Sequence, residues 1–232
     1  MLLFSARALH KHYAAGVPGC SAVARVLSGI TLELATGQLV GIVGRRASGK
    51  TTLLRCVAGL ARPDAGALHW EDCARRPRFV SVSVAAYPFD TVGDVIGRGL
   101  NESAVDPTRL ESLLDLFGLQ GSLDKAQFAL TTCERARLAL AVSLAAASSL
   151  MLLDGTPDAL SDAWRPVVRE ALATHAATGG AVLLAGRDMP GVAALAHSVL
   201  ELRDGRLEAP GRERDRQPPA RVAEANARGI IR

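Results

Sequence analysis

The sequence has 232 residues, enough for one α/β domain with a hydrophobic core, and 49% of them are hydrophobic, which excludes an intrinsically disordered chain. The net charge is only +4, and 210–232 supplies most of the excess, so the rest of the chain offers no extended basic surface for nucleic acid. The four cysteines form no C-x-x-C pair, so they indicate no metal centre, and a reducing compartment is expected.

No segment of the sequence is expected to cross a membrane. The N-terminus lacks the charged start, apolar run and cleavage site of a signal peptide. The longest uncharged run, 138–153, has 16 residues and contains three serines, which fits a helix followed by a buried strand better than a span. If the protein works at a membrane, another chain is expected to provide the membrane part.

The N-terminal part of the chain alternates apolar runs with turn-forming residues. Residues 14–25 are rich in Gly, Pro and Ala and are expected to form a loop. A helix is expected at 52–60, followed by a turn at 62–66. Strands are expected at 2–13, 30–34, 39–43, 67–71 and 79–84.

The middle of the chain has a helical pattern. Asp90 and Thr91 can cap a helix that runs to 97, and Asp106-Pro107 can start a second one. The leucines of the second helix and Phe117 share one face, and Gly118 ends it. This pattern predicts a helical subdomain at about 86–135, inserted between strands of a sheet.

After this insertion, helices and strands alternate again. Helices are expected at 135–147, 163–176 and 190–196, strands at 150–154 and 181–185, and a hairpin joining 198–202 to 206–207. Pro, Arg and Glu dominate from residue 210, which predicts a charged, loosely held tail at 210–232 after one domain at 1–209.

The segment 44–52, the phosphate loop, matches the pattern G-x-x-x-x-G-K-[ST]. It lies between a buried strand and a predicted helix, the context in which backbone amides and a helix N-terminus converge on phosphate oxygens. Lys50 would place its charge on the β- and γ-phosphates, and Thr51 would give a hydroxyl to Mg²⁺. The alternative is a chance match in a chain rich in Ala and Gly.

The order of these elements resembles the nucleotide-binding domain of ABC (ATP-binding cassette) transporters over roughly residues 2–210. The segments that carry the resemblance are 49–55, 58–60, 63–66 and the closing hairpin 202–207. The resemblance implies an α/β P-loop NTPase fold of ABC type. Its mixed sheet core would be flanked by helices, with an antiparallel edge sheet and the helical insertion.

The resemblance also implies ligands and partners. Tyr13 stands where the family places an aromatic residue that stacks on adenine, and Asp154 stands where it places a carboxylate associated with Mg²⁺. The residues predicted to contact ATP–Mg²⁺ are Tyr13, Gly44, Arg45, Ala47, Ser48, Gly49, Lys50, Thr51, Thr52 and Asp154, of which Thr51 and Asp154 would hold the metal. The implied partners are a transmembrane subunit and a second nucleotide-binding subunit, identical or different, at the inner face of the cell membrane.

Three positions associated with hydrolysis depart from the family pattern. Gly155 replaces the Glu that orients the attacking water, and glycine has no side chain to accept a proton. Arg187 replaces the switch His, and it is expected either to reach the γ-phosphate as a fixed cation or to face solvent. Ser83, within one or two residues, replaces the Gln that couples Mg²⁺ to the membrane partner.

The segment that would face a partner's ATP also departs from the family pattern, usually Leu-Ser-Gly-Gly-Gln. Here it is 130–134, in which Thr131 keeps a hydroxyl. Thr132 and Cys133 replace glycines whose backbone must approach the opposite γ-phosphate, and Glu134 adds a negative charge. Both ATP sites of a pair would therefore be affected.

The sequence favours a binding module that holds ATP–Mg²⁺ with little or no hydrolysis and acts as a structural or regulatory subunit. One alternative is a slow ABC transporter ATPase in which Asp158, Asp188 or a partner residue places the water. A second is a P-loop protein of another class, such as a nucleotide kinase or a DNA-repair ATPase. A third is vestigial binding, since the Ala47 methyl can crowd the loop.

Overall fold

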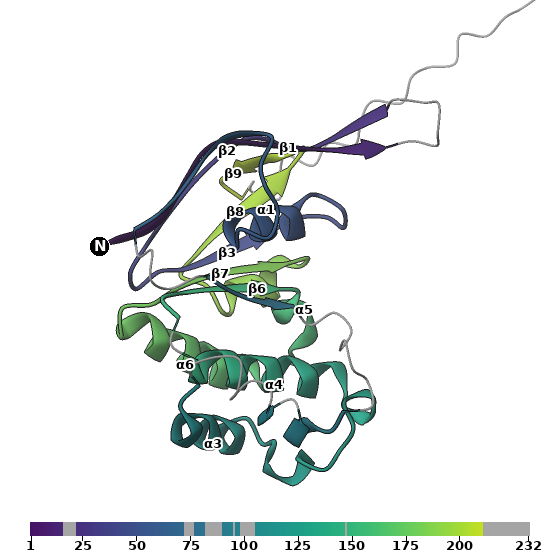
Figure 1. Ribbon diagram of the computed structural model, residues 1–232, viewed down its shortest axis with the longest axis vertical. Coiled ribbons are helices and arrows are strands. Elements are labelled where there is room, and N and C mark those ends of the chain that lie inside the picture. Colours follow the sequence, from purple (N-terminus) through teal and green to yellow (C-terminus); the bar gives the residue numbers. More distant parts are fainter. Residues whose placement is uncertain are drawn as a thin grey trace, which may run out of the picture.

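The computed structural model describes residues 1–15, 22–71, 77–81, 90–94, 96–97, 105–146 and 148–210, with strands in two sheets (Figure 1). The strands are β1 (Leu2–Ala15), β2 (Ala22–Ala35), β3 (Leu39–Val43), β4 (Ala65–Trp70), β5 (Arg78–Ser81), β6 (Leu150–Asp154), β7 (Ala181–Gly186), β8 (Ser198–Arg203) and β9 (Arg206–Glu208). The α-helices are α1 (Lys50–Val57), α3 (Pro107–Leu116), α4 (Thr132–Ala145), α5 (Thr156–Ala159), α6 (Arg165–Ala177) and α7 (Met189–Ala193).

The larger sheet has the order β5-β6-β7-β3-β8-β9, with parallel pairing from β5 to β8 and an antiparallel β8–β9 hairpin. The central strands β3, β6 and β7 are continuous apolar runs, as strands covered on both faces require. Val43 pairs with Gly186, and Asp154 pairs with Ala185. The ends of β3, β6 and β7 therefore meet at one edge of the sheet, and the mixed sheet is confirmed.

The smaller sheet is antiparallel, in the order β2-β1-β4. Its strands β1 and β2 are 14 residues long each, so the expectation of a loop over the whole of 14–25 is wrong. Ala24 pairs with Tyr13, and Ala22 pairs with Ala15. Alanine is a poor predictor of strand when read alone, but cross-strand pairing holds this segment extended.

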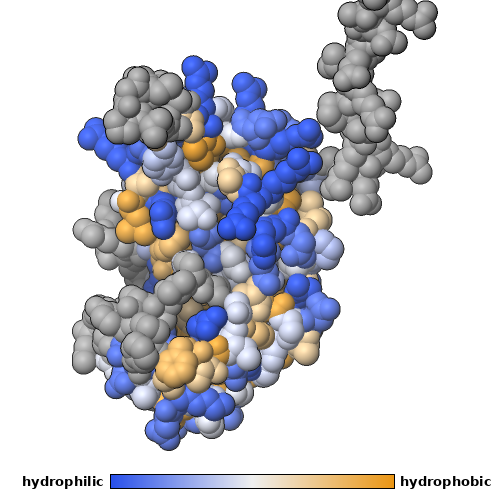
Figure 2. All heavy atoms as spheres, turned by 90° about the vertical axis from the view of Figure 1, so that its right-hand side faces the viewer, coloured by the Kyte–Doolittle hydropathy of each residue, from blue (hydrophilic) through white to orange (hydrophobic). Residues whose placement is uncertain are grey.

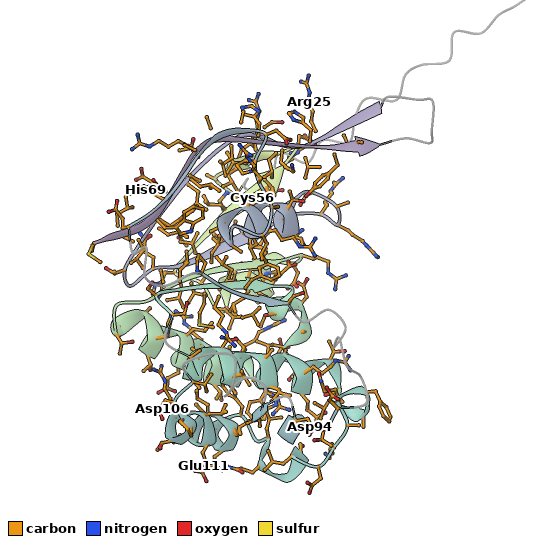
Figure 3. The ribbon with its side chains drawn as sticks, viewed as in Figure 1. Arg25, Cys56, His69, Asp94, Asp106 and Glu111 are labelled. Carbon is orange, nitrogen blue, oxygen red and sulfur yellow. The ribbon has the colours of Figure 1, made fainter. Side chains whose placement is uncertain are left out.

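The molecule is built in layers, which Figure 1 shows from the β1-β2-β4 sheet down to α3. Helix α1 lies between the two sheets and buries Leu53, Leu54, Cys56 and Val57 in one of two hydrophobic clusters. Figure 3 shows Cys56 on α1 beneath this sheet, whereas Arg25 projects outward from β2. The opposite face of the larger sheet is covered by α4, α6 and α7, with α3 outside α4.

The described part of the helical insertion agrees with its sequence pattern. Asp106 caps α3 by accepting hydrogen bonds from the amides of residues 108 and 109, and Gly118 takes a positive φ just after the helix. Residues 92–94 and 96–97 are helical. The amides of Thr91 and Asp94 each donate a hydrogen bond to the side chain of the other residue. Within the described ranges, no helix has the length and apolar character needed to cross a bilayer.

His175 predicts a pH dependence of stability. It lies buried in the last turn of α6, its Nε2 has no hydrogen-bond partner among the described residues, and a Cβ on Gly180 would come within 2.3 Å of that nitrogen. Burial lowers the pKa of His175, and the charge of Arg109 lowers it further. As pH falls, His175 therefore binds its proton at a higher pH in the unfolded chain than in the folded protein.

The stability contribution of a neutral His175 is thus complete above its unfolded pKa of about 6.5 and is lost as pH falls below that value toward the lower folded pKa. We expect the melting temperature of the wild type to fall more steeply between about pH 7 and pH 5 than that of His175→Leu. His197→Gln, which removes an exposed histidine, should keep the wild-type slope. Equal slopes for all three proteins would contradict this account.

Candidate functional site

The phosphate loop joins the end of β3 to the start of α1, and two glycines fix its path. A Cβ on Gly44 would come within 2.6 Å of the Leu202 carbonyl oxygen. Gly49 has φ +104°, and a Cβ there would lie 2.9 Å from the Val26 carbonyl oxygen. The loop is therefore packed between β8 and β2, and any side chain at these two positions would displace it.

Ala47 is a third residue with special geometry in this loop. Its φ is 62°, in the left-handed region that glycine enters freely and alanine enters at a cost of about 1 kcal/mol. The resemblance places a glycine here. The loop holds its path with alanine in that place, and the side chain of Ala47 is exposed.

Lys50 lies across the phosphate loop. Its Nζ donates hydrogen bonds to the carbonyl oxygens of Gly44 (2.6 Å) and Arg45 (2.8 Å) and to Ser48 Oγ (3.3 Å). Burial lowers the pKa of Lys50, while the nearby carboxylates of Asp158 and Asp154 oppose that shift. The ammonium is thus held where phosphate oxygens can replace the carbonyls as partners.

Thr51 and Asp154 meet although 103 residues separate them. Thr51 Oγ1 donates a hydrogen bond to Asp154 Oδ2 at 2.8 Å. Among the described residues, no three His, Cys, Asp or Glu side chains are grouped to hold a metal alone. A hydroxyl and one carboxylate fit Mg²⁺, because this ion is usually held by one or two protein oxygens together with phosphate oxygens and waters.

A hollow of about 280 Å³ lies beside the loop. Its lining is Tyr13, Val26, Ala47, Ser48, Gly49, Lys50, Thr51 and Thr52. Figure 2 views this end of the molecule, where hydrophilic side chains gather over the upper and middle part. The structure thus brings Tyr13 of β1, 31 positions before Gly44 in the chain, to the hollow beside the loop.

Gly155 leaves a gap where the resemblance places a Glu. It has φ +73° at the start of α5, and its amide donates to the Ala185 carbonyl oxygen at 3.0 Å. A Cβ there would meet no atom of the described residues within 4 Å. Among these residues, position 155 has room for a side chain, but its backbone would resist one.

Arg187 is paired with Asp158. The Arg187 amide donates to Asp158 Oδ1 at 2.8 Å, and its Nε donates to Asp158 Oδ2 at 3.0 Å. The Arg187 side chain is 65% exposed and that of Asp158 only 13%. The nearby Asp188 accepts a hydrogen bond from the Gly191 amide as the cap of α7. Both aspartates are therefore engaged in structural contacts.

The segment 130–134 contains the cap and the first residues of α4. This helix begins at Thr132, so the expected start at 135 is wrong, because the capping box of Thr131 and Glu134 starts the helix earlier. Thr131 Oγ1 accepts from the Glu134 amide, and Glu134 Oε2 accepts from the amide and hydroxyl of Thr131 at 2.8 Å each. These bonds lower the pKa of Glu134, which keeps its negative charge.

Several predicted features fall outside the described residues or were missed. Ser83 and the tail from 211 onward lie outside them, as do Cys20 and Cys73. Val26 was missed as a lining residue because it is the extra residue of a bulge, between the pairs Lys11–Leu27 and His12–Arg25. The pairing of Asp158 with Arg187 was missed because 29 residues separate them and no local pattern links them.

Comparisons with known proteins agree on the kind of molecule. A sequence profile of the family described as "ABC transporter" matches residues 27–156. An Fe(3+) ions import ATP-binding protein of Rhodococcus jostii is 34% identical over 208 residues, 83% of this chain and 59% of the relative. A sulfate/thiosulfate import ATP-binding protein of Caulobacter vibrioides is 35% identical over 199 residues, 78% of this chain and 59% of the relative. The chain thus spans about three fifths of the length of these relatives.

Solved structures give the same fold. An ATP-binding subunit of an ABC transporter superposes with a TM-score of 0.74 at 19% identity, covering 92% of this chain and 91% of the other. A dimeric ATP-binding cassette with bound ADP and phosphate superposes with a TM-score of 0.75 at 19% identity, covering 89% of this chain and 97% of the other. The fold is therefore that of an ATP-binding cassette.

Proposed function

Because the chain belongs to the ABC transporter family, we propose that it is an ATP-binding subunit of an ABC-type transport complex, which holds ATP–Mg²⁺ with little or no hydrolysis. It would work with a transmembrane subunit and a second nucleotide-binding subunit at the cytoplasmic side of the membrane. Residues 1–209 would form the nucleotide-binding domain, with the helical subdomain at about 86–135 and the charged tail at 210–232.

The observation that carries nucleotide binding is the intact geometry of the phosphate loop. Lys50 Nζ is held on the loop carbonyls, and Thr51 Oγ1 lies 2.8 Å from Asp154 Oδ2. The N-terminus of α1 adds amides that have no partner within the helix, and these favour an anion. Together these groups match the β- and γ-phosphates and the metal of ATP–Mg²⁺.

The residues around the expected position of the attacking water support weak hydrolysis. Gly155 offers no base, and removing a positioned base typically lowers a rate by about 10²–10⁴-fold. Asp158 could act as a substitute only by giving up Arg187, and Asp188 only by giving up its capping bond to the Gly191 amide. These contacts argue against the slow ATPase as the main activity.

The segment 130–134 extends this proposal to a partner's site. In the sandwich that the family resemblance implies, the start of α4 faces the ATP of the other subunit. Thr132 and Cys133 bring side chains where bare backbone is needed, and Glu134 brings a negative charge toward a triphosphate. A complex of two such chains would therefore bind nucleotide without efficient turnover at either site.

We expect the membrane partner to determine which cargo is transported. Relatives of similar identity, 34–35%, have names that specify iron(III), sulfate or thiosulfate, and aliphatic sulfonates. Since such different cargoes go with similarly related ATP-binding proteins, we propose that this chain supplies the nucleotide site and not cargo specificity.

Arg187 is proposed to strengthen ATP binding through its charge. Arg187→Ala should weaken ATP–Mg²⁺ binding by about threefold in titration calorimetry, both because a cation near Lys50 is lost and because Asp158 is left uncompensated. Arg203→Ala, which removes an exposed cation from the β8–β9 hairpin, should leave the affinity unchanged. Equal affinities for wild type and Arg187→Ala would remove Arg187 from the binding site.

A further inference from the structure

Tyr13 is an aromatic residue that lines the hollow beside the phosphate loop, and the residue is 43% exposed. It lies near the end of β1, where it pairs with Ala24 of β2. An exposed tyrosine on a strand is ordinarily free to change rotamer. A ring that serves as a stacking surface must instead be held in one orientation. The contacts that the ring makes with neighbouring side chains decide whether it is held in this way.

Lys11 provides such a contact. Its Nζ lies 5.3 Å from the centroid of the Tyr13 ring, within the range of a cation–π interaction. The Lys11 side chain is only 16% exposed, although it carries a charge. The cation therefore lies over one face of the ring.

Asp64 holds Lys11 in this place. Asp64 Oδ1 accepts a hydrogen bond from Lys11 Nζ at 2.9 Å, and Asp64 Oδ2 accepts from the amide and Nδ1 of His12. Asp64 belongs to the turn between α1 and β4, and its amide donates to the His10 carbonyl oxygen at 2.8 Å. The turn that follows the phosphate-loop helix is thus tied to the strand that carries Tyr13.

From this chain of contacts we infer that Lys11, fixed by Asp64, is a positioning residue that holds the Tyr13 ring as the stacking surface for the base of the bound nucleotide. The inference rests on the proposed function and deepens it. A cation on one face withdraws electron density from the ring, which favours stacking of an electron-rich purine on the other. Lys11 thereby contributes to recognition of the base and not of the phosphates.

The test separates base recognition from general attraction of phosphate. Titration calorimetry with Mg²⁺ compares ATP and inorganic tripolyphosphate on wild type, Lys11→Met, Lys11→Arg and Tyr13→Leu, and on the double variant of Lys11→Met with Tyr13→Leu. Lys11→Met should weaken ATP binding by about threefold and leave tripolyphosphate unchanged. Lys11→Arg should restore the affinity for ATP, and Lys11→Met should have no effect in the Tyr13→Leu background.

A matched control is Arg7→Met, which removes an exposed cation from the same strand and should change neither affinity. An equal loss for ATP and tripolyphosphate would overturn the inference, because Lys11 would then act on phosphate. An equal loss with and without Tyr13 would also overturn it, since Lys11 would only stabilise β1, and so would unchanged ATP affinity. If the wild type bound neither ligand, the proposed function itself would fail.

Discussion

Lys50→Ala should weaken ATP–Mg²⁺ binding by about a hundredfold and leave the melting temperature of the free protein nearly unchanged. The Lys50 ammonium is held by Gly44, Arg45 and Ser48 at the loop where the phosphates would bind. A charge-assisted hydrogen bond contributes about 1.5–3 kcal/mol, and 2.7 kcal/mol corresponds to a hundredfold in affinity. Titration calorimetry measures the affinity, and a thermal melt of the free protein checks its folding.

Arg55→Ala is the matched control for Lys50→Ala. Arg55 lies on the same helix, in its last turn, with an exposed side chain. Its removal changes the net charge by the same amount and should alter the affinity less than about twofold. If Lys50→Ala bound ATP as tightly as wild type, the phosphate loop would not be the nucleotide site.

Arg137→Ala should lower the free energy of unfolding by about 3 kcal/mol. Arg137 is 7% exposed in the middle of α4, with its guanidinium 3.9 Å from the centroid of the Trp164 ring. One of its nitrogens donates a hydrogen bond to the Phe117 carbonyl oxygen. The substitution removes the stacking and the stem of the side chain, and it leaves a buried carbonyl without its partner.

Urea denaturation measures this effect, with Arg109→Ala as the control. Arg109 is an exposed arginine on the neighbouring helix α3, and its removal should change the free energy of unfolding by less than about 0.5 kcal/mol. A loss below about 1 kcal/mol for Arg137→Ala would show that the Trp164 and Phe117 contacts contribute little to joining α3, α4 and α6.

Much of the fold follows from local patterns in the sequence. The buried strands 39–43 and 150–154 have the predicted bounds, because a continuous apolar run followed by a glycine or an aspartate leaves little freedom in placing its end. The phosphate loop follows from its motif, whereas the place of Asp154 beside Thr51 was implied by the family resemblance. The sequence also predicted that Asp106 would cap α3, through the pair Asp106-Pro107.

The remaining features depend on contacts between distant segments. The extension of β2 back to Ala22 comes from pairing with β1 and not from its own composition. The ties from Asp158 to Arg187 and from Asp64 to Lys11 join residues 29 and 53 positions apart. Each of these charged side chains could equally lie in solvent, so the sequence alone does not indicate the pairs. Only the fold brings the opposite charges together.

These contacts sharpen the contrast between binding and turnover. The groups proposed to hold a triphosphate and Mg²⁺ lie together at the phosphate loop, whereas Gly155 has no side chain to activate water and Asp158 is paired with Arg187. We therefore expect nucleotide affinity and hydrolysis to depend on different residues of this chain, and they can be measured separately.

The most direct test is Mg²⁺-dependent phosphate release from saturating ATP by the purified wild type, alone and with its partner subunits, beside Lys50→Ala. We expect the wild type to bind ATP but to release phosphate no faster than Lys50→Ala does when each is assayed alone. With a partner present, phosphate release should depend on the partner's site and not on Lys50. Multiple turnovers that disappear in Lys50→Ala would contradict the account, because this chain would then hydrolyse the nucleotide that it binds.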